Sequence, residues 1–234
     1  MNIRNIINTY TQKGYKFKDA QNLAAEEIII KKIASSDMVE HVAFKGGIVM
    51  FNLTKNNRRV TQDIDFDLIR YSIDKESISM FINKMNRIDD GFNVFIHGDI
   101  EDLHQEDYHG VRVHIIIRDK NNNTVRTKLD IGVHTYSAIE QDNVIFSFDS
   151  NEEGISIKVN PKEQIVAEKL IALARLGKLS KRYKDLYDVY YLINECDISK
   201  KKVSEILSLF FINSKRKPNN LLDFINTIED TLND

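Results

Sequence analysis

The sequence has one cysteine, two prolines and no tryptophan, and it contains no long hydrophobic run. The single cysteine, Cys196, excludes an internal disulfide and fits a reducing compartment, so we expect a cytoplasmic protein. No apolar run approaches the roughly 20 residues of a membrane-spanning helix, and the first residues lack the apolar centre of a signal peptide. We therefore expect no membrane partner.

Two common phosphate-binding patterns are also missing. The chain has neither a G-x-x-x-x-G-K-[ST] loop nor a G-x-G-x-x-G fingerprint, so any phosphate site must be of another kind. The chain does have 234 residues, of which 42% are hydrophobic. This is enough for one large domain or two small ones with an ordinary core.

The segment 44–67 carries most of the chemical information. A short apolar strand is expected at 41–44, and Gly46 and Gly47 follow it at the start of a predicted helix. Two glycines permit positive φ and close approach of a ligand, and amides at a helix N-terminus bind phosphate groups. The residues of this segment that we expect to bind nucleotide are Lys45, Gly46, Gly47, Arg59 and Thr61.

Asp63, Asp65 and Asp67 alternate with apolar residues in the strand predicted next. Alternate residues share one face of a strand, so the three carboxylates point the same way. They repel one another unless cations lie among them, and such oxygen ligands suit Mg²⁺ or Mn²⁺. An exposed edge strand would explain the alternation by itself. The glycine pair upstream favours a site.

Asp130 lies in a further strand candidate, 125–133, among apolar neighbours where an unpaired charge is costly. If this strand lies beside the strand of Asp63 and Asp65, Asp130 completes a carboxylate triad that binds metal. The alternative is a surface aspartate next to Lys128.

The pattern changes near residue 158. Before it, helices are expected at 2–13, 18–35 and 75–88, strands at 64–69, 92–97, 111–118 and 155–159, and a charged loop at 99–110. After it, the helices expected are 162–176, 182–194, 199–211 and 221–232. We therefore predict an α/β (α+β) part over 1–158 and an all-helical part over 159–234.

Two of the later helices carry charged residues within amphipathic patterns. Lys169 lies on the first of them, and Asp185 and Asp188 lie three residues apart on one face of the second. A lysine near an acidic triad suits the binding of a triphosphate. An ion pair that ties the two helices together is the structural alternative, and both can hold.

Taken in order, these motifs resemble the AbiEii/AbiGii abortive-infection toxins, a nucleotidyltransferase family that includes the MenT toxins. The resemblance covers about residues 40–195. It rests on Lys45-Gly46-Gly47, Arg58/Arg59-x-Thr61-x-Asp63-Ile64-Asp65-Phe66, Lys128-Leu129-Asp130, Ala167-Glu168-Lys169-Leu170 and Lys184-Asp185-Leu186-Tyr187-Asp188.

The resemblance implies a polymerase-beta-like nucleotidyltransferase core with a mixed sheet, followed by a helical C-terminal part. It implies Mg²⁺-dependent transfer from a nucleoside triphosphate, with Asp63 and Asp65 as metal ligands. Lys169, Asp185 and Asp188 match residues required for toxicity in the family. Members act on tRNA or related targets and are paired with an antitoxin, often a winged-helix protein.

Two alternatives stay open at this point. The same site could modify a protein hydroxyl or pass a phosphoryl group, because the metals and phosphates are common to all these reactions. The chain could also be an inactive module of the same fold that binds nucleic acid or a partner. The candidate catalytic residues are Asp63, Asp65, Asp130, Lys169, Asp185 and Asp188.

Overall fold

The computed structural model describes residues 2–55, 60–105, 108–134, 136–148, 151–176, 183–213 and 226. The chain divides into two compact units. The first comprises Met1–Ser137 and Gln141–Val159, and the second comprises Ala138–Glu140 and Asn160–Asp234. The predicted boundary after residue 158 lies close to this division, although the short segment 138–140 was not expected in the second unit.

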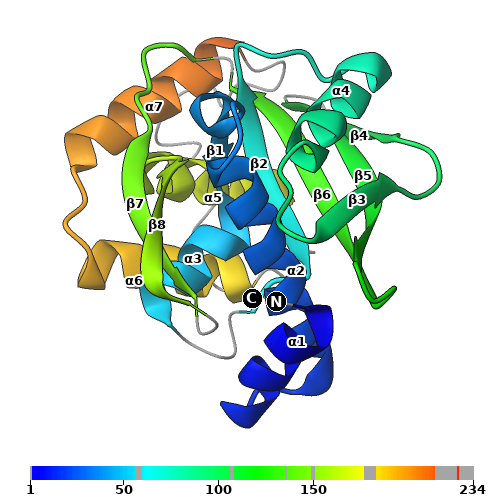
Figure 1. Cartoon of the computed structure of the whole chain (residues 1–234). Coiled ribbons are helices and arrows are strands. Elements are labelled where there is room, and N and C mark those ends of the chain that lie inside the picture. The colour runs from blue at the N-terminus through cyan, green and yellow to red at the C-terminus, as the bar shows by residue number, and fades with distance from the viewer. Residues whose placement is uncertain are drawn as a thin grey trace. The chain divides into compact units, whose positions relative to one another are not determined.

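The first unit is built on a mixed sheet. Its described strands are β1 (Val42–Phe44), β2 (Asp63–Ile69), β3 (Phe92–Ile96), β4 (Glu101–Gln105), β5 (Tyr108–Asp119), β6 (Thr124–His134), β7 (Asp142–Phe148) and β8 (Asn151–Val159). They follow the order β3-β5-β6-β2-β1-β8-β7, and β4 pairs with β5 (Figure 1). β2 runs parallel to β6 and β1 runs parallel to β8, whereas the other pairs are antiparallel.

The helices of the first unit are α1 (Ile3–Gln12), α2 (Phe17–Ala34), α3 (Gly46–Thr54) and α4 (Lys75–Asn86), with a short 3₁₀ turn η1 (Val39–His41). Side chains cap two of them. Asn2 accepts a hydrogen bond from the amide of Asn5, and Asp74 accepts one from the amide of Ser77. α2 contacts α1, α4, β6 and β8, so it is buried on almost every side.

The alternation in β2 decides which face of the sheet becomes core. Phe66 is fully buried between Phe44 of β1 and Phe81 of α4, with ring centroids 5.7 and 5.6 Å apart. Because successive side chains alternate, Asp63 and Asp65 point to the opposite face. The same rule buries Val113 of β5 while leaving its neighbours more exposed. Packing of the apolar face therefore fixes the direction of the acidic residues.

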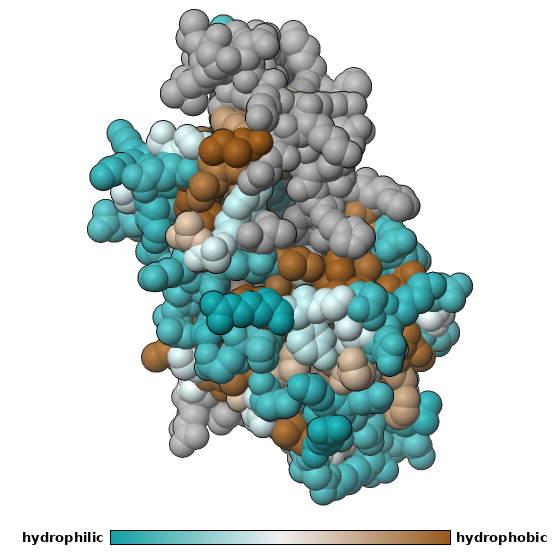
Figure 2. Space-filling view, turned by 90° about the horizontal axis from the view of Figure 1, so that it is seen from above, coloured by the Kyte–Doolittle hydropathy of each residue, from teal (hydrophilic) through white to brown (hydrophobic). Residues whose placement is uncertain are grey.

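The second unit is helical in its described part, with α5 (Lys162–Leu176), α6 (Tyr183–Glu195) and α7 (Lys200–Asn213). α5 packs against both α6 and α7. The Glu163 carboxylate accepts a hydrogen bond from the Ser199 amide just before α7. The helix predicted at 221–232 lies outside the described residues apart from residue 226. Hydrophilic residues cover much of the described surface on the side shown in Figure 2, with apolar residues between them.

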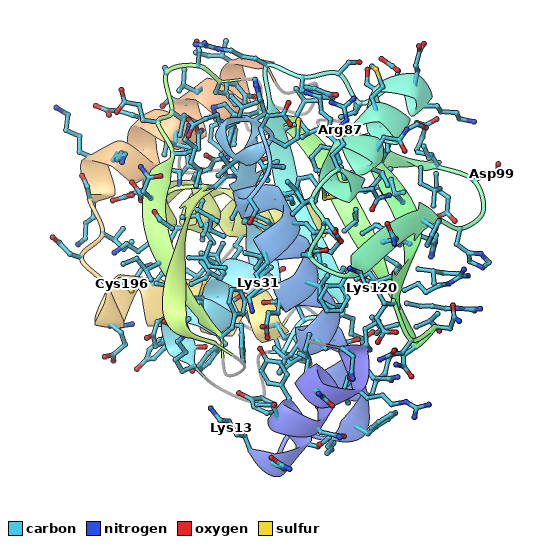
Figure 3. All side chains as sticks on the ribbon, in the orientation of Figure 1. Lys13, Lys31, Arg87, Asp99, Lys120 and Cys196 are labelled. Carbon is cyan, nitrogen blue, oxygen red and sulfur yellow. The ribbon has the colours of Figure 1, made fainter. Side chains whose placement is uncertain are left out.

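Two sequence predictions are wrong in this fold. The segment 99–110, predicted as a charged loop, contains β4 and the start of β5, which pair as an antiparallel hairpin with Glu101 opposite Arg112. Figure 3 shows Asp99 projecting from the connection that precedes β4. β7 was not predicted at all. Both strands lie at sheet edges, and the usual apolar alternation is obscured in each. β4 is mostly polar, and in β7 the exposed, apolar Ile145 interrupts the pattern.

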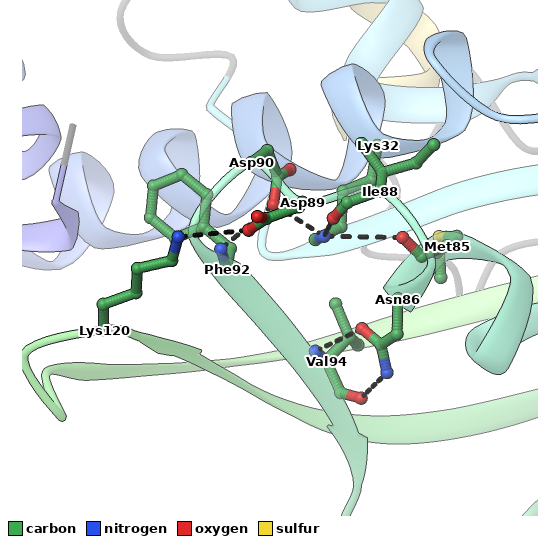
Figure 4. Close-up of polar contacts among 9 residues, drawn as sticks. All are labelled: Lys32, Met85, Asn86, Ile88, Asp89, Asp90, Phe92, Val94 and Lys120. Carbon is green, nitrogen blue, oxygen red and sulfur yellow. Dashed lines mark hydrogen bonds and ion pairs between the residues drawn. The ribbon is translucent and has the colours of Figure 1, made fainter.

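Lys32 illustrates how α2 is fastened to α4. Its side chain is fully buried, and its ammonium donates to the carbonyl oxygens of Met85 and Ile88 at 3.4 and 3.3 Å and to Asp90 at 2.8 Å (Figure 4). Met85 lies in the last turn of α4 and Ile88 lies two residues beyond its end, and each carbonyl oxygen also accepts one backbone hydrogen bond, from the amides of Ile88 and Asp90 respectively. Lys32 is therefore a structural cation.

We expect Lys32→Met to lower the free energy of unfolding by about 2–4 kcal/mol, because it removes these bonds and strands the partly buried Asp90. Urea unfolding would measure the loss. Lys120→Met is the matched control, because Lys120 forms only an exposed pair with Asp89 nearby and should cost less than about 0.5 kcal/mol. Equal losses for the two variants would contradict the role of Lys32.

Candidate active site

The turn between β1 and α3 packs directly on the start of β2. Gly46 has a φ of 63°, and a Cβ atom there would lie 2.6 Å from Oδ2 of Asp65. A Cβ atom on Gly47 would lie 2.8 Å from both Cβ and Oγ1 of Thr61. Any larger residue would collide at either position. The glycine pair therefore brings backbone amides of α3 against Asp65, as close approach requires.

The parallel pairing of β2 with β6 places the predicted carboxylates on one face. Asp65 is the register partner of Asp130, and Asp63 is the register partner of Lys128. On the other side of β6, Asp130 lies opposite Arg112 of β5. The strand neighbours on which the predicted triad depended are therefore present in the sheet.

Each outer carboxylate has a cation beside it. Lys128 Nζ lies 2.8 Å from Oδ1 of Asp63. Arg112 forms a two-pronged pair with Asp130, at 2.8 Å from Nε and 2.6 Å from Nη2, and this pair raises the pKa of the guanidinium. Within the described residues, no group of three His, Cys, Asp or Glu side chains is arranged as a metal site. The like charges are instead separated by basic side chains.

Lys45 also has an acidic partner. Its ammonium lies 2.7 Å from Oδ1 of Asp67, whose side chain is buried. The sequence placed this lysine near a phosphate. In the structure, the Lys45 ammonium is paired with Asp67 of β2, the strand that also carries Asp65.

Asp65 is partly buried. Unlike Asp63, Asp67 and Asp130, it has no basic side chain at ion-pair distance among the described residues. Burial raises its pKa to about 7, against the charge of Lys45 and with the charges of Asp130 and Asp63. The amide of Gly47 lowers the pKa in part. Crowding of this kind would be relieved by a hard divalent ion, which would have to displace Lys128 and Arg112 from the two outer carboxylates.

The second predicted group lies in the second unit. Lys169 of α5 pairs with Asp185 and Asp188 of α6, at 2.8 and 2.7 Å. Asp188 is fully buried, whereas Lys169 and Asp185 are 12% and 15% exposed. The structure brings the three residues together as ion pairs that connect α5 with α6, which is the structural alternative given for them above. Arg59 lies outside the described residues.

Comparison with known proteins identifies the family. Residues 28–234 match the model of the nucleotidyl transferase AbiEii toxin, type IV toxin–antitoxin system. This chain belongs to the AbiEii nucleotidyltransferase toxin family. The resemblance found in the sequence motifs is thereby confirmed. None of the curated proteins matches the chain.

Two solved structures are similar to this AbiEii chain at low identity. One is an antigenic nucleotidyltransferase-like protein from Paracoccidioides brasiliensis, with a TM-score of 0.48, 13% identity, and coverage of 90% of this chain and 93% of that one. The other is the antibiotic-resistance factor ANT(2″)-Ia, with a TM-score of 0.46, 13% identity, and coverage of 80% and 90%. The described helices of the AbiEii chain include none whose length and hydropathy would suit a membrane span.

Sequence reasoning missed Glu26, a buried carboxyl group of α2. It is only 4% exposed, and its Oε2 atom has no hydrogen-bond partner. Burial raises its pKa to about 8, with Lys55 opposing the shift and Asp65 and Glu27 adding to it. The charge of Asp65 therefore contributes to the raised pKa of Glu26 in the core. The available signal was an acidic pair that lies directly between two apolar runs, Leu23–Ala25 and Ile28–Ile30.

The raised pKa of Glu26 predicts a pH dependence of stability. A carboxyl group whose pKa rises from 4.5 to about 8 on folding stabilises the protein fully below pH 4.5, and this contribution is lost as the pH rises through 8. The wild type should therefore lose a few kcal/mol more unfolding free energy between pH 5 and pH 9 than Glu26→Gln does. Thermal melts between pH 5 and pH 9 would measure it.

The control for this prediction is Glu76→Gln, because Glu76 is exposed in the first turn of α4. Its profile should follow that of the wild type. If Glu26→Gln also follows the wild type, Glu26 is charged in the folded protein and the prediction fails.

Proposed function

We propose that this AbiEii chain transfers a nucleotide from a nucleoside triphosphate to an RNA hydroxyl, tRNA being the expected acceptor. The observation that carries the proposal is the packing of the Gly46–Gly47 turn against Asp65, with Asp130 in register beside it. Such a turn offers helix amides to phosphate oxygens next to carboxylates that suit Mg²⁺ or Mn²⁺.

The residues would divide the work as follows. The amides of Gly46 and Gly47 would hold the β- and γ-phosphates, with Thr61 beside the turn. Arg59, which lies outside the described residues, stays a candidate from the sequence alone. Asp63, Asp65 and Asp130 would hold the divalent ion, which neutralises charge on the phosphates when bound. Lys128 and Arg112 are paired with Asp63 and Asp130 in the structure. The divalent ion would therefore compete with these two basic side chains for the carboxylates.

The bond changes follow from the chemistry of nucleotidyl transfer. The acceptor oxygen would attack the α-phosphorus, the bond to the β-phosphate would break, and pyrophosphate would leave. The hydroxyl proton would pass to a carboxylate, for which Asp130 is the candidate. Lys169 would stabilise phosphate charge, while Asp185 and Asp188 would hold it in one orientation.

In the cell, we expect this activity to be the toxic function of a toxin–antitoxin pair. The family description supports a toxin of a type IV system. A winged-helix antitoxin is the expected partner, and the cytoplasm is the expected compartment. These points rest on the resemblance and on family membership.

The test uses triphosphates labelled at the α or the γ position, incubated with protein and total cell lysate in Mg²⁺. We expect α label to enter RNA, and chelation or Asp65→Asn to abolish it. Asp89→Asn, which changes an exposed carboxylate in a loop, is the matched control and should retain activity. Transfer from the γ position alone would show phosphoryl transfer, and label on protein would show a protein acceptor.

The inactive-module alternative needs a separate measurement. Calorimetry with each nucleotide, with and without Mg²⁺, would detect binding at the site directly. We expect binding that requires the metal. Metal-independent binding, or none, together with no label in any fraction, would favour the module and reject the enzyme.

A further inference from the structure

Part of the sheet in the first unit has an open face. In β3, β5 and β6, the side chains that point toward α2 and α4 are buried, whereas alternate side chains are largely exposed. We define the open sheet face by six residues of these strands, Asn93, Phe95, Ile116, Arg118, Thr124 and Arg126. Of these, Ile116 is partly buried and the others are exposed.

Strand register connects this face to the candidate active site. Across the strands, the side chains on this face form four successive rungs. From the hairpin end of β5 and β6 they are Asn93–Arg118–Thr124, Phe95–Ile116–Arg126, His114–Lys128–Asp63 and Glu101–Arg112–Asp130–Asp65. Six residues of β6 separate the first rung from the last, about 20 Å at about 3.4 Å per residue.

The charges change along these rungs. In the last two rungs, every arginine, lysine and histidine has a carboxylate within 3.3 Å. In the first two, Arg118 and Arg126 have no carboxylate at ion-pair distance among the described residues, and neither rung contains an acid. Two exposed cations are therefore available to an anionic ligand.

An aromatic ring lies between these cations and the sheet edge. Phe95 is 44% exposed, and the guanidinium of Arg118 lies over its ring at 5.1 Å from the centroid. An exposed phenylalanine with a flat cation beside it is a stacking surface for a nucleobase. Asn93 and Thr124 add hydrogen-bonding groups on the same rung as Arg118.

We propose that the open sheet face binds a single-stranded polynucleotide and leads its end toward Asp65 and Asp130. The proposal rests on the proposed function for the identity of that strand as the acceptor. Phosphates would contact Arg118 and Arg126, and one base would stack on Phe95. A duplex keeps its bases stacked inside, so it could not use the ring.

Other occupants fit this face less well. A stable protein interface has an apolar centre with few charges, whereas this face has one aromatic and one aliphatic residue among polar and basic side chains. Charge complementarity and the continuity of the rungs with the carboxylates both favour a polyanionic strand.

The experiment measures binding of a short fluorescein-labelled oligouridylate to the full chain by fluorescence anisotropy, without nucleotide or Mg²⁺. We expect the Arg118→Gln/Arg126→Gln double variant to bind at least tenfold more weakly, with a log–log salt slope reduced by about 1.4. Phe95→Leu should weaken binding about 5- to 50-fold with an unchanged salt slope. Melting temperatures would verify folding.

The control is Lys200→Gln/Lys201→Gln, which removes two exposed cations from α7. We expect it to bind within about twofold of the wild type. The proposal is overturned if this variant loses as much affinity as the double arginine variant, or if a duplex of equal length binds as well as the single strand. It is also overturned if the arginine variant only abolishes self-association of the chain and leaves oligonucleotide binding unchanged.

These outcomes separate the binding surface from the chemistry. If the wild type binds through the arginines but transfers no nucleotide, the proposed function fails and the surface stands. If transfer to RNA occurs and the arginine variant binds normally, the surface fails alone.

Discussion

Asp65→Asn is expected to abolish nucleotide transfer and, in the metal-free protein, to raise the free energy of unfolding by about 1–3 kcal/mol at pH 8. The activity is lost because the central carboxylate of the candidate site is replaced by an amide. The stability rises because Asp65 is crowded: burial and the charges of Asp130 and Asp63 raise its pKa to about 7. A neutral side chain of the same shape avoids that cost.

The size of this stability difference depends on pH. Since the pKa of Asp65 is raised above its ordinary 3.8, its protonated form is favoured in the folded protein. The wild type therefore loses the stability that protonated Asp65 contributes as the pH rises from about 4 through 7, and the asparagine variant does not share this loss. The difference should vanish below pH 3.8 and be full above pH 7.

Asp67→Asn is the matched comparison, because the same chemical change is made two residues further along the same face. Asp67 is buried and pairs with Lys45 at 2.7 Å, so its replacement should destabilise the protein. Thermal melts without metal and transfer assays on both variants would measure the contrast. A large loss of stability in Asp65→Asn, similar to that of Asp67→Asn, would make Asp65 structural.

Local sequence pattern predicted the parts of this site that depend on neighbouring residues. A glycine pair before a helix and alternation in the following strand need only short-range rules, and both features are present at Gly46–Gly47 and in β2. The meeting of Asp65 and Asp130 was conditional, because it requires β2 and β6 to be neighbours although about sixty residues separate them. Family resemblance, rather than pattern, favoured that pairing.

The partners of the charged residues could not be predicted in the same way. Arg112 contacts Asp130 only because β5 lies on the far side of β6, and Glu26 senses Asp65 only because α2 is buried against the sheet. Both relations depend on the order of strands and the placement of a helix. The open sheet face likewise emerges only when β3, β5 and β6 are placed in register.

Lys169 is expected to show both a structural and a functional role. Lys169→Met should lower the free energy of unfolding by about 3–5 kcal/mol, because it leaves the fully buried Asp188 without its ammonium partner. Urea unfolding would measure the loss. Transfer activity should also disappear, as Lys169 is the cation proposed to stabilise phosphate charge.

A second variant separates these two effects. Lys169→Met/Asp188→Leu replaces the lysine and the fully buried carboxylate by apolar side chains. Such replacements are often neutral or stabilising, so part of the lost stability should return although Asp185, which is 15% exposed, keeps its charge. Transfer should stay abolished, because no cation is restored. If the double variant recovers both stability and activity, Lys169 serves only to hold α5 and α6 together, and its place in the phosphate site must be abandoned.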